Sequence, residues 1–428
     1  MLATLPVALS VMIAAIFSWV TSLIILKTRS AHVRYTSKGH AGLEVQSMHE
    51  HPTPRIGGVA VALGLTAAAC VHMSLDQPIV LVLLAAMPVF FAGLAEDIGL
   101  TASPRLRLAA AATSAALAIY ATGASIQDGV APGLDDLLKL TFFSAILTVF
   151  SVAALCHAFN LIDGMNGLAS TMALAACASL GAISYSVGDA QILALCAATF
   201  AATTGVLLLN YPFGKLFLGD AGAYSLGFVI GWIGVLLIHR HPEISVWAVL
   251  LCVFLPFADT TAAILRRIKK RAPIGQPDKL HYHHIVKRVM DQCLRDEVAQ
   301  TWSNPLATLF MQPVIVLPAV WAVFAAKSDI GALLGLAFSF GLYFGTRKKL
   351  LDSFKAVARS LKGAPDFAKP AKHPTTLRIN QSDDTGTPSY KLEPVHADLK
   401  RKTAQREAPV LETRTLENTF KAAVNEDA

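Results

Sequence analysis

The chain has 428 residues, of which 54% are hydrophobic and only 15% are charged, and its formal net charge is +7. Ordinary soluble domains carry roughly 25% charged residues, so this composition excludes a single soluble core, a disordered chain and a coiled coil, and leaves a polytopic membrane protein. Most of the excess positive charge lies in residues 347–428, and because no nucleic-acid recognition module accompanies it, we expect a membrane-surface role and no nucleic-acid partner.

Apolar segments recur along the chain at the length that a membrane-spanning helix needs, which is about 20 residues. The first segment has no basic stretch before it, and its first cation is Lys27, so we interpret it as a retained span and not as a cleaved signal. The fold class that this pattern predicts is an all-α polytopic membrane protein with about eleven transmembrane helices. The predicted spans are residues 4–26, 56–75, 78–96, 105–125, 139–159, 166–186, 190–209, 220–238, 244–265, 305–326 and 330–346.

Lysine and arginine residues between the predicted spans fall mainly on one side. If the N-terminus lies outside, the inner connections contain 17 Lys/Arg, and the outer connections contain three, namely Lys139, Arg240 and Lys327. The excess of basic residues on the cytoplasmic side of membrane proteins therefore predicts an outer N-terminus and a cytoplasmic C-terminus.

The chain is predicted to consist of a membrane domain, residues 1–346, and a basic cytoplasmic tail, residues 347–428. Leu350, Phe354 and Leu361 recur at helical spacing at the start of the tail, so we expect a short interfacial helix there. Beyond this helix Pro, Thr, Lys and Glu predominate, which is typical of a disordered segment.

Polar and ionisable residues gather where the predicted spans meet the cytoplasmic side. Charged groups at membrane depth are costly, and a functional site is their default interpretation. Any one of these carboxylates could merely cap a helix or pair with a nearby arginine, but their recurrence on one face favours a shared site. The polar and ionisable residues at this face are Glu96 and Asp97, Asn160 and Asp163, Asp220, Asp259, and the run His281-Tyr282-His283-His284.

A group of carboxylates suits a hard divalent cation. Mg²⁺, with Mn²⁺ as the alternative ion, takes one or two oxygens from protein together with substrate phosphates. Asp220 lies in a Gly-Asp-x-Gly turn that lets the backbone approach closely, and Asn160 offers an amide oxygen. Arg55, Arg105 and Arg107 fall on the same face and suit anionic phosphates. This combination indicates phosphoryl transfer at a membrane surface.

The three histidines His281, His283 and His284 have more than one interpretation. A zinc site is one, but helical ligand pairs usually stand at positions i and i+4, and neither a Cys ligand nor a distant fourth ligand is obvious. Contact of donor imidazoles with a substrate phosphate is the second interpretation, and structural polar packing is the third.

Five short motifs, in this order over about residues 49–288, resemble those of the polyprenyl-phosphate N-acetylhexosamine-1-phosphate transferases. The resemblance implies a bacterial enzyme in which a lipid phosphate attacks the sugar-bearing phosphorus of a UDP-N-acetylhexosamine, so that UMP leaves and a polyprenyl-diphospho-sugar forms. The motifs are Pro52-Thr-Pro-Arg-Ile-Gly-Gly58, Glu96-Asp97, Asn160-x-x-Asp163-Gly-x-Asn166-Gly167, Gly219-Asp-Ala-Gly222 and Asp278-x-x-His281-x-His283-His284.

The resemblance also implies roles for the catalytic and metal-binding residues. Asp220 would bind Mg²⁺, with Asn160 as its partner. Glu96 and Asp97 would hold or deprotonate the lipid phosphate, and Asp97 is the stronger candidate of the two. The family commonly has Asp-Asp at this position, so the longer arm of Glu96 is a departure from its pattern.

The remaining roles concern the substrates. Asn166 would contact uracil in a pocket shaped by Asp163, although many members have an Asp where this chain has Asn166. The histidines at 281, 283 and 284 would hold the diphosphate or sugar end. Arg55, Arg105 and Arg107 would contact phosphates.

The resemblance further implies the setting of the reaction. The partners would be a UDP-N-acetylhexosamine, undecaprenyl phosphate and the lipid bilayer of the bacterial inner (plasma) membrane, with the active site facing the cytoplasm. The product would start an O-antigen-like cell-envelope polysaccharide. GlcNAc, FucNAc and QuiNAc stay open as the sugar, whereas MurNAc-pentapeptide is not favoured by the motifs, and a homodimer stays open.

Two other functions compete with this one. A transporter of sugar phosphates or cations would place its charges near the bilayer midplane, commonly with broken helices and inverted repeats, whereas the polar clusters here lie at one face. A scaffold that recruits partners through the basic tail would leave Asp220 and its companions unexplained.

Overall fold

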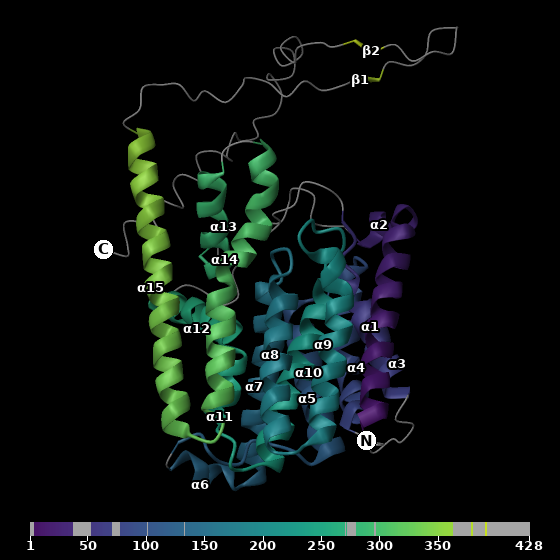
Figure 1. The fold of residues 1–428 in the computed structure, drawn as a ribbon, viewed down its shortest axis with the longest axis vertical. Coiled ribbons are helices and arrows are strands. Elements are labelled where there is room, and N and C mark those ends of the chain that lie inside the picture. The colour runs from purple at the N-terminus through teal and green to yellow at the C-terminus, as the bar shows by residue number, and fades with distance from the viewer. Residues whose placement is uncertain are drawn as a thin grey trace. The chain divides into compact units, whose positions relative to one another are not determined.

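The computed structural model describes residues 4–36, 53–70, 78–100, 102–131, 133–269, 271, 280–294 and 297–362, with two residue pairs in the tail. The chain consists of two compact units, unit 1 (Met1–Val357) and unit 2 (Ala358–Ala428). Where it is described, unit 1 is entirely helical, and Figure 1 shows its long helices running side by side. The motif residues Pro52 and Asp278 lie outside the described residues.

The described part of the chain forms fifteen helices. They are α1 (Thr4–Lys27), α2 (Arg29–Thr36), α3 (Gly57–Cys70), α4 (Pro78–Asp97), α5 (Pro104–Thr122), α6 (Leu134–Leu138), α7 (Thr141–Ile162), α8 (Leu168–Ser186), α9 (Ala190–Asn210), α10 (Gly219–Arg240), α11 (Val246–Cys252), α12 (Phe254–Lys269), α13 (Tyr282–Cys293), α14 (Glu297–Phe324) and α15 (Asp329–Lys362). In unit 2, the two-residue strands β1 (Arg378–Ile379) and β2 (Tyr390–Lys391) pair antiparallel.

Eight helices among the described residues are long and apolar enough to cross a membrane: α1, α4, α7, α8, α9, α10, α14 and α15. The bent pair α11 and α12 would make a ninth. Helix α3 is apolar but only 14 residues long, and α5 carries two arginines and many small residues. Each predicted span contains a helix, and the polytopic membrane class is supported, but the predicted count of eleven is not confirmed.

The predicted span 244–265 is bent in the structure. Helices α11 and α12 meet there at an angle of 91°. Pro256 has no backbone N–H and cannot donate to the carbonyl four residues earlier, at Cys252, where α11 ends. The break turns α12 and places Asp259 in the interior of unit 1, with its side chain buried.

Two other expectations about the cytoplasmic segments need correction. The predicted interfacial helix of the tail is the continuation of the last span, because α15 runs unbroken to Lys362 and no Gly or Pro interrupts it after Gly345. The inner loop that holds the histidines contains the helix α13, which we did not predict. Tyr282, Ile285 and Val286 are buried along one face of it, at the spacing of an amphipathic helix.

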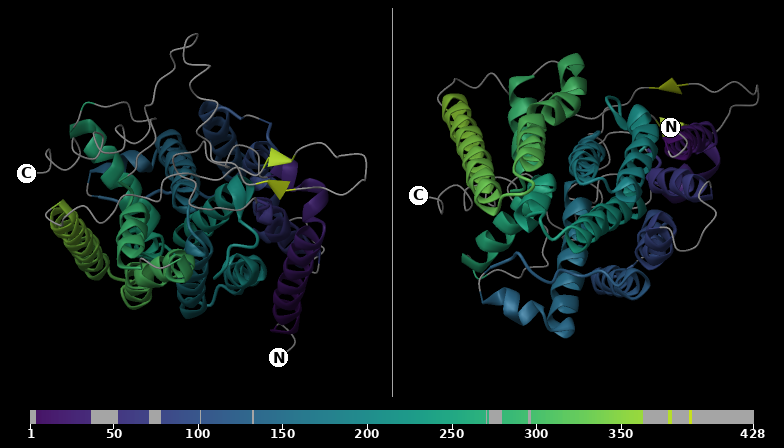
Figure 2. Two further views of the ribbon diagram at one scale, coloured as in Figure 1. Left: turned by 90° about the horizontal axis from the view of Figure 1, so that it is seen from above. Right: turned by 60° about the horizontal axis from the view of Figure 1, so that its bottom comes forward.

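Helix α10 lies at the centre of unit 1. Almost every residue from Gly219 to Ile238 is buried, and the helix packs against α3, α4, α5, α7, α8 and α9. Small residues permit this close packing, since a Cβ atom on Gly227 would lie 2.8 Å from the Cα atom of Cys156 on α7. Viewed from above and from below, α14 and α15 (green) lie to one side of the central helices and α1 (purple) to the other (Figure 2). The first turn of α10 is therefore held from several sides.

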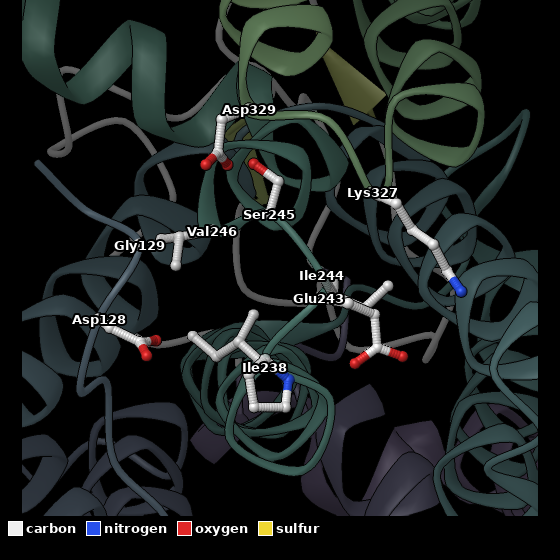
Figure 3. A pocket seen from close by; sticks show the side chains of 10 residues that line it. Asp128, Gly129, Ile238, Glu243, Ile244, Ser245, Val246, Lys327 and Asp329 are labelled. Carbon is white, nitrogen blue, oxygen red and sulfur yellow. The ribbon is translucent and has the colours of Figure 1, made fainter.

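The two ends of α10 meet different sets of connections. At its C-terminal end a small cavity brings together Asp128, Glu243, Lys327 and Asp329 from three connections (Figure 3). The 22 residues of α10 span about 33 Å, so this cavity is far from the polar residues around the first turn. All three connections belong to the predicted outer side, and the polar motifs gather at the opposite end.

Candidate active site

The segment that precedes α3 lies along the segment that precedes α10. The backbone N–H of Gly58 donates to the carbonyl of Leu218 (2.7 Å), and the N–H of Phe217 donates to the carbonyl of Pro54 (2.9 Å). These hydrogen bonds between residues far apart in the chain fix Arg55 beside the start of α10.

Glycines let these backbones approach. Gly219 has φ of +77°, in the left-handed region, and a Cβ atom there would overlap the carbonyl oxygen of Arg55. A Cβ atom on Gly58 would overlap the backbone of Gly222, and one on Gly93 of α4 would lie 2.6 Å from the backbone nitrogen of Ala221. Helices α3, α4 and α10 therefore meet backbone to backbone at the first turn of α10.

Asp97, the last residue of α4, binds the beginning of α10. Its Oδ1 accepts a hydrogen bond from the backbone N–H of Asp220 (2.8 Å), and its Oδ2 accepts one from that of Ala221 (2.8 Å). The first N–H groups of a helix have no partner within the helix, and they carry the positive end of its dipole, so a buried carboxylate is well placed there. Both oxygens of Asp97 are occupied by backbone donors in this structure.

Asp220 gathers side chains from three other segments. Its Oδ2 lies 2.7 Å from Nη1 of Arg107 on α5, and its Oδ1 lies 3.7 Å from Nη2 of Arg55. The amide nitrogen of Asn160, at the end of α7, donates to Oδ1 at 3.0 Å. The carboxylate is thus neutralised by two arginines and directly contacts the asparagine with which the motifs pair it.

Glu96 and Arg105 were also predicted as site residues, and both lie at the margin of the group around Asp220. Glu96 accepts a hydrogen bond through Oε2 from the backbone N–H of Ala102 (2.9 Å) and so closes the turn between α4 and α5. Arg105 is exposed on the first turn of α5, two residues before Arg107. Their predicted roles as substrate contacts stay predictions.

Asp163 lies in the turn between α7 and α8, close to the same group. Burial raises the pKa of Asp163 to about 8; Arg55 opposes this shift, and the carboxylate of Asp220 adds to it. The Asp163 carboxyl therefore keeps its proton to a higher pH than an exposed Asp does.

Asn166 lies in the same turn and is held by α14 and by the loop after α9. Its backbone N–H donates to Oδ1 of Asn304 (2.9 Å), and the hydroxyl of Thr308 donates to its carbonyl (2.8 Å). Its amide nitrogen donates to the carbonyl of Pro212 (2.7 Å). The side-chain oxygen Oδ1 of Asn166 is buried and has no hydrogen-bond partner, so it is an unsatisfied acceptor in this turn.

Asn210, at the end of α9, joins this turn to the loop before α10. Its side-chain oxygen accepts from the backbone N–H of Gly167, and its amide nitrogen donates to the carbonyl of Leu216 (2.7 Å). Asn210, Asn304 and Thr308 were not predicted from the sequence as residues of the site. A buried polar residue at the end of an apolar span was the available signal for Asn210.

The three histidines lie together beside this turn. His281, His283 and His284 are all buried, and the ring centroids of His283 and His284 are 4.2 Å apart. A Cβ atom on Gly164 would lie 3.2 Å from Nε2 of His283, so the histidine ring lies against the turn that carries Asp163. Tertiary packing brings the last motif to the turn that carries Asp163, although more than 100 residues separate them.

A partly buried pair one helical turn deeper was not predicted from the sequence. The hydroxyl of Tyr224 on α10 lies 3.3 Å from Nδ1 of His157 on α7, and the guanidinium of Arg107 lies 5.9 Å from the centroid of the Tyr224 ring. His157 precedes Asn160 by three residues and Tyr224 follows Asp220 by four, the spacings at which side chains share a helix face. That spacing was the signal that could have found them.

The side chains of Asp220 and Asn160 are chemically compatible with a magnesium ion. Carboxylate and amide oxygens, as Asp220 and Asn160 supply, are hard ligands of the kind that Mg²⁺ prefers. Within the part of the chain that the structure describes, no three His, Cys, Asp or Glu side chains are arranged to hold a metal ion by themselves. An ion here would therefore need oxygen ligands from substrate phosphates in addition to these two residues.

Comparison with known proteins identifies the segment that contains most of this site. The model of glycosyl transferase family 4 matches residues 79–238, from α4 to the end of α10. This segment is therefore similar to glycosyl transferase family 4. It contains Asp97, Arg107, Asn160 and Asp220, whereas Arg55 and the histidines lie outside the matched range. The family resemblance drawn from the motifs is thereby confirmed.

Several curated proteins are similar to the chain over part of their length. A "probable undecaprenyl-phosphate N-acetylglucosaminyl 1-phosphate transferase" of Bacillus subtilis is 28% identical over 242 residues, which are 56% of this chain and 67% of that protein. An undecaprenyl-phosphate alpha-N-acetylglucosaminyl 1-phosphate transferase of Escherichia coli is 33% identical over 152 residues, which are 34% of this chain and 41% of that protein. A Yersinia pestis protein of the same name is 32% identical over 152 residues.

Proposed function

We propose that the protein transfers N-acetylhexosamine 1-phosphate from a UDP-sugar to undecaprenyl phosphate. One observation carries this proposal: Asp97, Asn160 and Asp220 converge from three helices at one end of the helix bundle, inside the segment that is similar to family 4. In the reaction, an oxygen of the lipid phosphate bonds to the sugar-bearing phosphorus. The bond from that phosphorus to the bridging oxygen breaks, and UMP leaves with that oxygen.

The charges of the residues around Asp220 would determine their roles in the reaction. Asp220 and Asn160 would hold Mg²⁺, and the bound ion would neutralise the diphosphate and orient its oxygens. Arg55 and Arg107, which contact Asp220 in this structure, are in reach of the same phosphates. A phosphate oxyanion is already a competent nucleophile, so positioning and charge neutralisation should contribute most of the catalysis.

The remaining predicted residues would bind the two substrates. Asn166, whose side-chain oxygen is buried and unpartnered, would accept a hydrogen bond from uracil, with Asp163 beside it. The three histidines would contact the diphosphate or the sugar. Glu96 would lie near the lipid phosphate, while Asp97 would act chiefly by holding the first turn of α10, because its two oxygens already accept backbone hydrogen bonds.

The proposed setting is the bacterial inner membrane, with the site facing the cytoplasm. The 17 to three distribution of Lys/Arg supports this orientation, and a UDP-sugar is a soluble cytoplasmic substrate. The product would be the first lipid-linked intermediate of an O-antigen-like cell-envelope polysaccharide. The names of the relatives favour GlcNAc as the sugar, with FucNAc and QuiNAc as alternatives.

A transfer assay tests the proposal directly. Purified protein in lipid nanodiscs is given undecaprenyl phosphate and a radiolabelled UDP-sugar, first UDP-GlcNAc and then the alternatives, with Mg²⁺ or with EDTA. We expect UMP and labelled lipid in equal amounts, only with Mg²⁺. Release of UDP in place of UMP would show sugar transfer without the phosphate, and no labelled lipid with any of the sugars would refute the proposal.

A further inference from the structure

Asp259 is a buried carboxylate that the proposed chemistry does not use. It lies in α12, just after the break from α11, and it is 1% exposed. Its Oδ2 lies 2.9 Å from Nδ1 of His281, and its Oδ1 accepts from the backbone N–H of Tyr282 (2.9 Å) and from the hydroxyl of Tyr343 on α15 (2.8 Å). A single carboxylate therefore joins three helical segments.

These contacts fix which nitrogen of His281 carries a proton. An ionised carboxylate can only accept hydrogen bonds, so Nδ1 of His281 must be the donor to Oδ2 of Asp259. The hydrogen bond that one ring nitrogen makes sets the tautomer of the imidazole, and it also fixes the orientation of the ring. On a five-membered ring the second nitrogen, Nε2, then points away from Asp259.

The ring held in this way belongs to the histidine cluster at the candidate active site. The centroid of the His281 ring lies 5.8 Å from that of His283, and the ring of His283 lies against Gly164 in the turn that carries Asp163. Asp259 itself contacts none of the residues around Asp220 in the described part of the chain. Oδ2 of Asp259 also lies 3.8 Å from Nδ1 of His283, beyond hydrogen-bond distance, so any influence of Asp259 on the reaction would act through these two histidines, and chiefly through His281, its hydrogen-bonded partner.

We propose that Asp259 is a positioning residue that keeps the proton of His281 on Nδ1 and presents Nε2 to the transferred sugar-phosphate group. The proposal rests on the proposed function, since it assigns His281 a place at the substrate. The competing explanation is a purely structural one, in which Asp259 merely ties α12, α13 and α15 together through Tyr282 and Tyr343.

Two variants separate these explanations. Asp259→Asn keeps the shape of the side chain, and its oxygen can still accept from Tyr282 and Tyr343, but its amide nitrogen then faces Nδ1 of His281. Nδ1 must become the acceptor, so the proton moves to Nε2. Tyr343→Phe is the matched control, because it removes a hydrogen bond from the same carboxylate and leaves the contact with His281 in place.

The first measurement needs no substrate. Protein labelled with ¹⁵N-histidine gives the protonation of each ring nitrogen from its chemical shift, and His281→Gln assigns the signal. We expect Nδ1–H in the wild type and in Tyr343→Phe, and Nε2–H in Asp259→Asn. A wild-type His281 protonated on Nε2 alone would overturn the proposal even if Asp259→Asn did not fold, and even if the protein had no transferase activity.

The second measurement is transfer kinetics. We expect Asp259→Asn to lower kcat about tenfold or more with a smaller change in the KM for UDP-sugar, as is typical when a residue that orients an active-site histidine is lost. Tyr343→Phe should lower the melting temperature without this loss of kcat. Asp259→Glu keeps the carboxylate and should restore part of the kcat that Asp259→Asn loses. In a His281→Gln background, Asp259→Asn should have little further effect.

The outcomes are distinguishable from failure of the proposed function. If the wild type makes no labelled lipid, the proposed function fails, and the ¹⁵N measurement still decides the Asp259–His281 pair. If the wild type is active, equal losses in Asp259→Asn and Tyr343→Phe that follow their melting temperatures would show a structural tie only. Full kcat in Asp259→Asn with the proton on Nε2 would also refute the positioning role.

Discussion

The Oδ1 atom of Asp97 lies 2.8 Å from the backbone nitrogen of Asp220, so one carboxylate holds in place the residue that we propose as a metal ligand. The second oxygen of Asp97 accepts the next N–H of α10, that of Ala221. Asp97 was predicted from the motif as the stronger candidate for contact with the lipid phosphate. The hydrogen bonds of Asp97 in this structure instead support a role in positioning the first turn of α10.

Asp97→Asn should therefore cost both activity and stability. An Asn has one acceptor oxygen, and its amide nitrogen would face a backbone N–H that has lost its partner. Hydrogen bonds to charged groups contribute about 1.5–3 kcal/mol, so we expect a clearly lower melting temperature together with loss of transfer. Thermal melting in detergent and the transfer assay check this. A variant with a wild-type melting temperature and no transfer would instead indicate that Asp97 acts on the substrate.

Asp220→Ala should abolish transfer while the protein still inserts into the membrane. The variant removes the carboxylate that Arg55, Arg107 and Asn160 surround, and with it the proposed ligand for Mg²⁺. Binding of Mn²⁺ in the presence of UDP-sugar, measured by electron paramagnetic resonance, should weaken strongly in parallel. Normal transfer rates in purified Asp220→Ala would contradict the metal assignment.

Arg107→Ala should impair transfer more than Arg105→Ala does. Arg107 contacts Asp220 at 2.7 Å and lies beside Tyr224, whereas Arg105 is exposed on the same helix. Loss of a charge-assisted phosphate contact is expected to reduce kcat/KM about tenfold or more. Steady-state kinetics of both variants, matched in charge and in helix position, test this prediction. Equal effects would mean that the pair with Asp220 has no special part in catalysis.

Gly58→Ala should be far more damaging than Gly341→Ala. A methyl group on Gly58 would overlap the backbone of Gly222, where α3 meets α10, whereas around Gly341 in α15 there is open space. Ala stabilises a helix interior relative to Gly by up to about 1 kcal/mol, so the control should be neutral or slightly stabilised. Yield in the membrane fraction and melting temperature measure the difference. Equal yields and melting temperatures would contradict the close approach of the two backbones.

The stability of the protein should fall as the pH is lowered below about 6.5, in part because of His283. Burial lowers the pKa of His283 well below its usual value, and the neighbouring His284 adds to this shift. In the folded state the ring therefore stays neutral where the unfolded chain takes up a proton. The unfolded state then binds more protons, so stability rises with pH in this range and is lost as the pH falls.

Melting temperatures between pH 5.5 and pH 8 test this prediction. His283→Gln removes the group and should flatten the dependence on pH relative to the wild type. An unchanged slope in the variant would show that other groups account for the acid sensitivity.

The sequence by itself determined the class of the protein and the short-range placement of its polar residues. Composition indicated a membrane protein, and the apolar segments located helices within all eleven predicted spans. Asp97, Asn160 and Asp220 could be placed at helix ends because each lies at or next to the end of an apolar run. Such features depend on neighbours within a few residues, which is why the sequence reveals them.

Tertiary structure alone decided which of these groups meet and how. Arg107 and Asp220 are 113 positions apart, and nothing local distinguishes Arg107 from Arg105 as the partner of that carboxylate. The same holds for Asp259, which the sequence places in a predicted span and the 91° break turns toward His281. Contacts between distant segments depend on how whole helices pack, and in this chain glycines at the first turn of α10 set that packing.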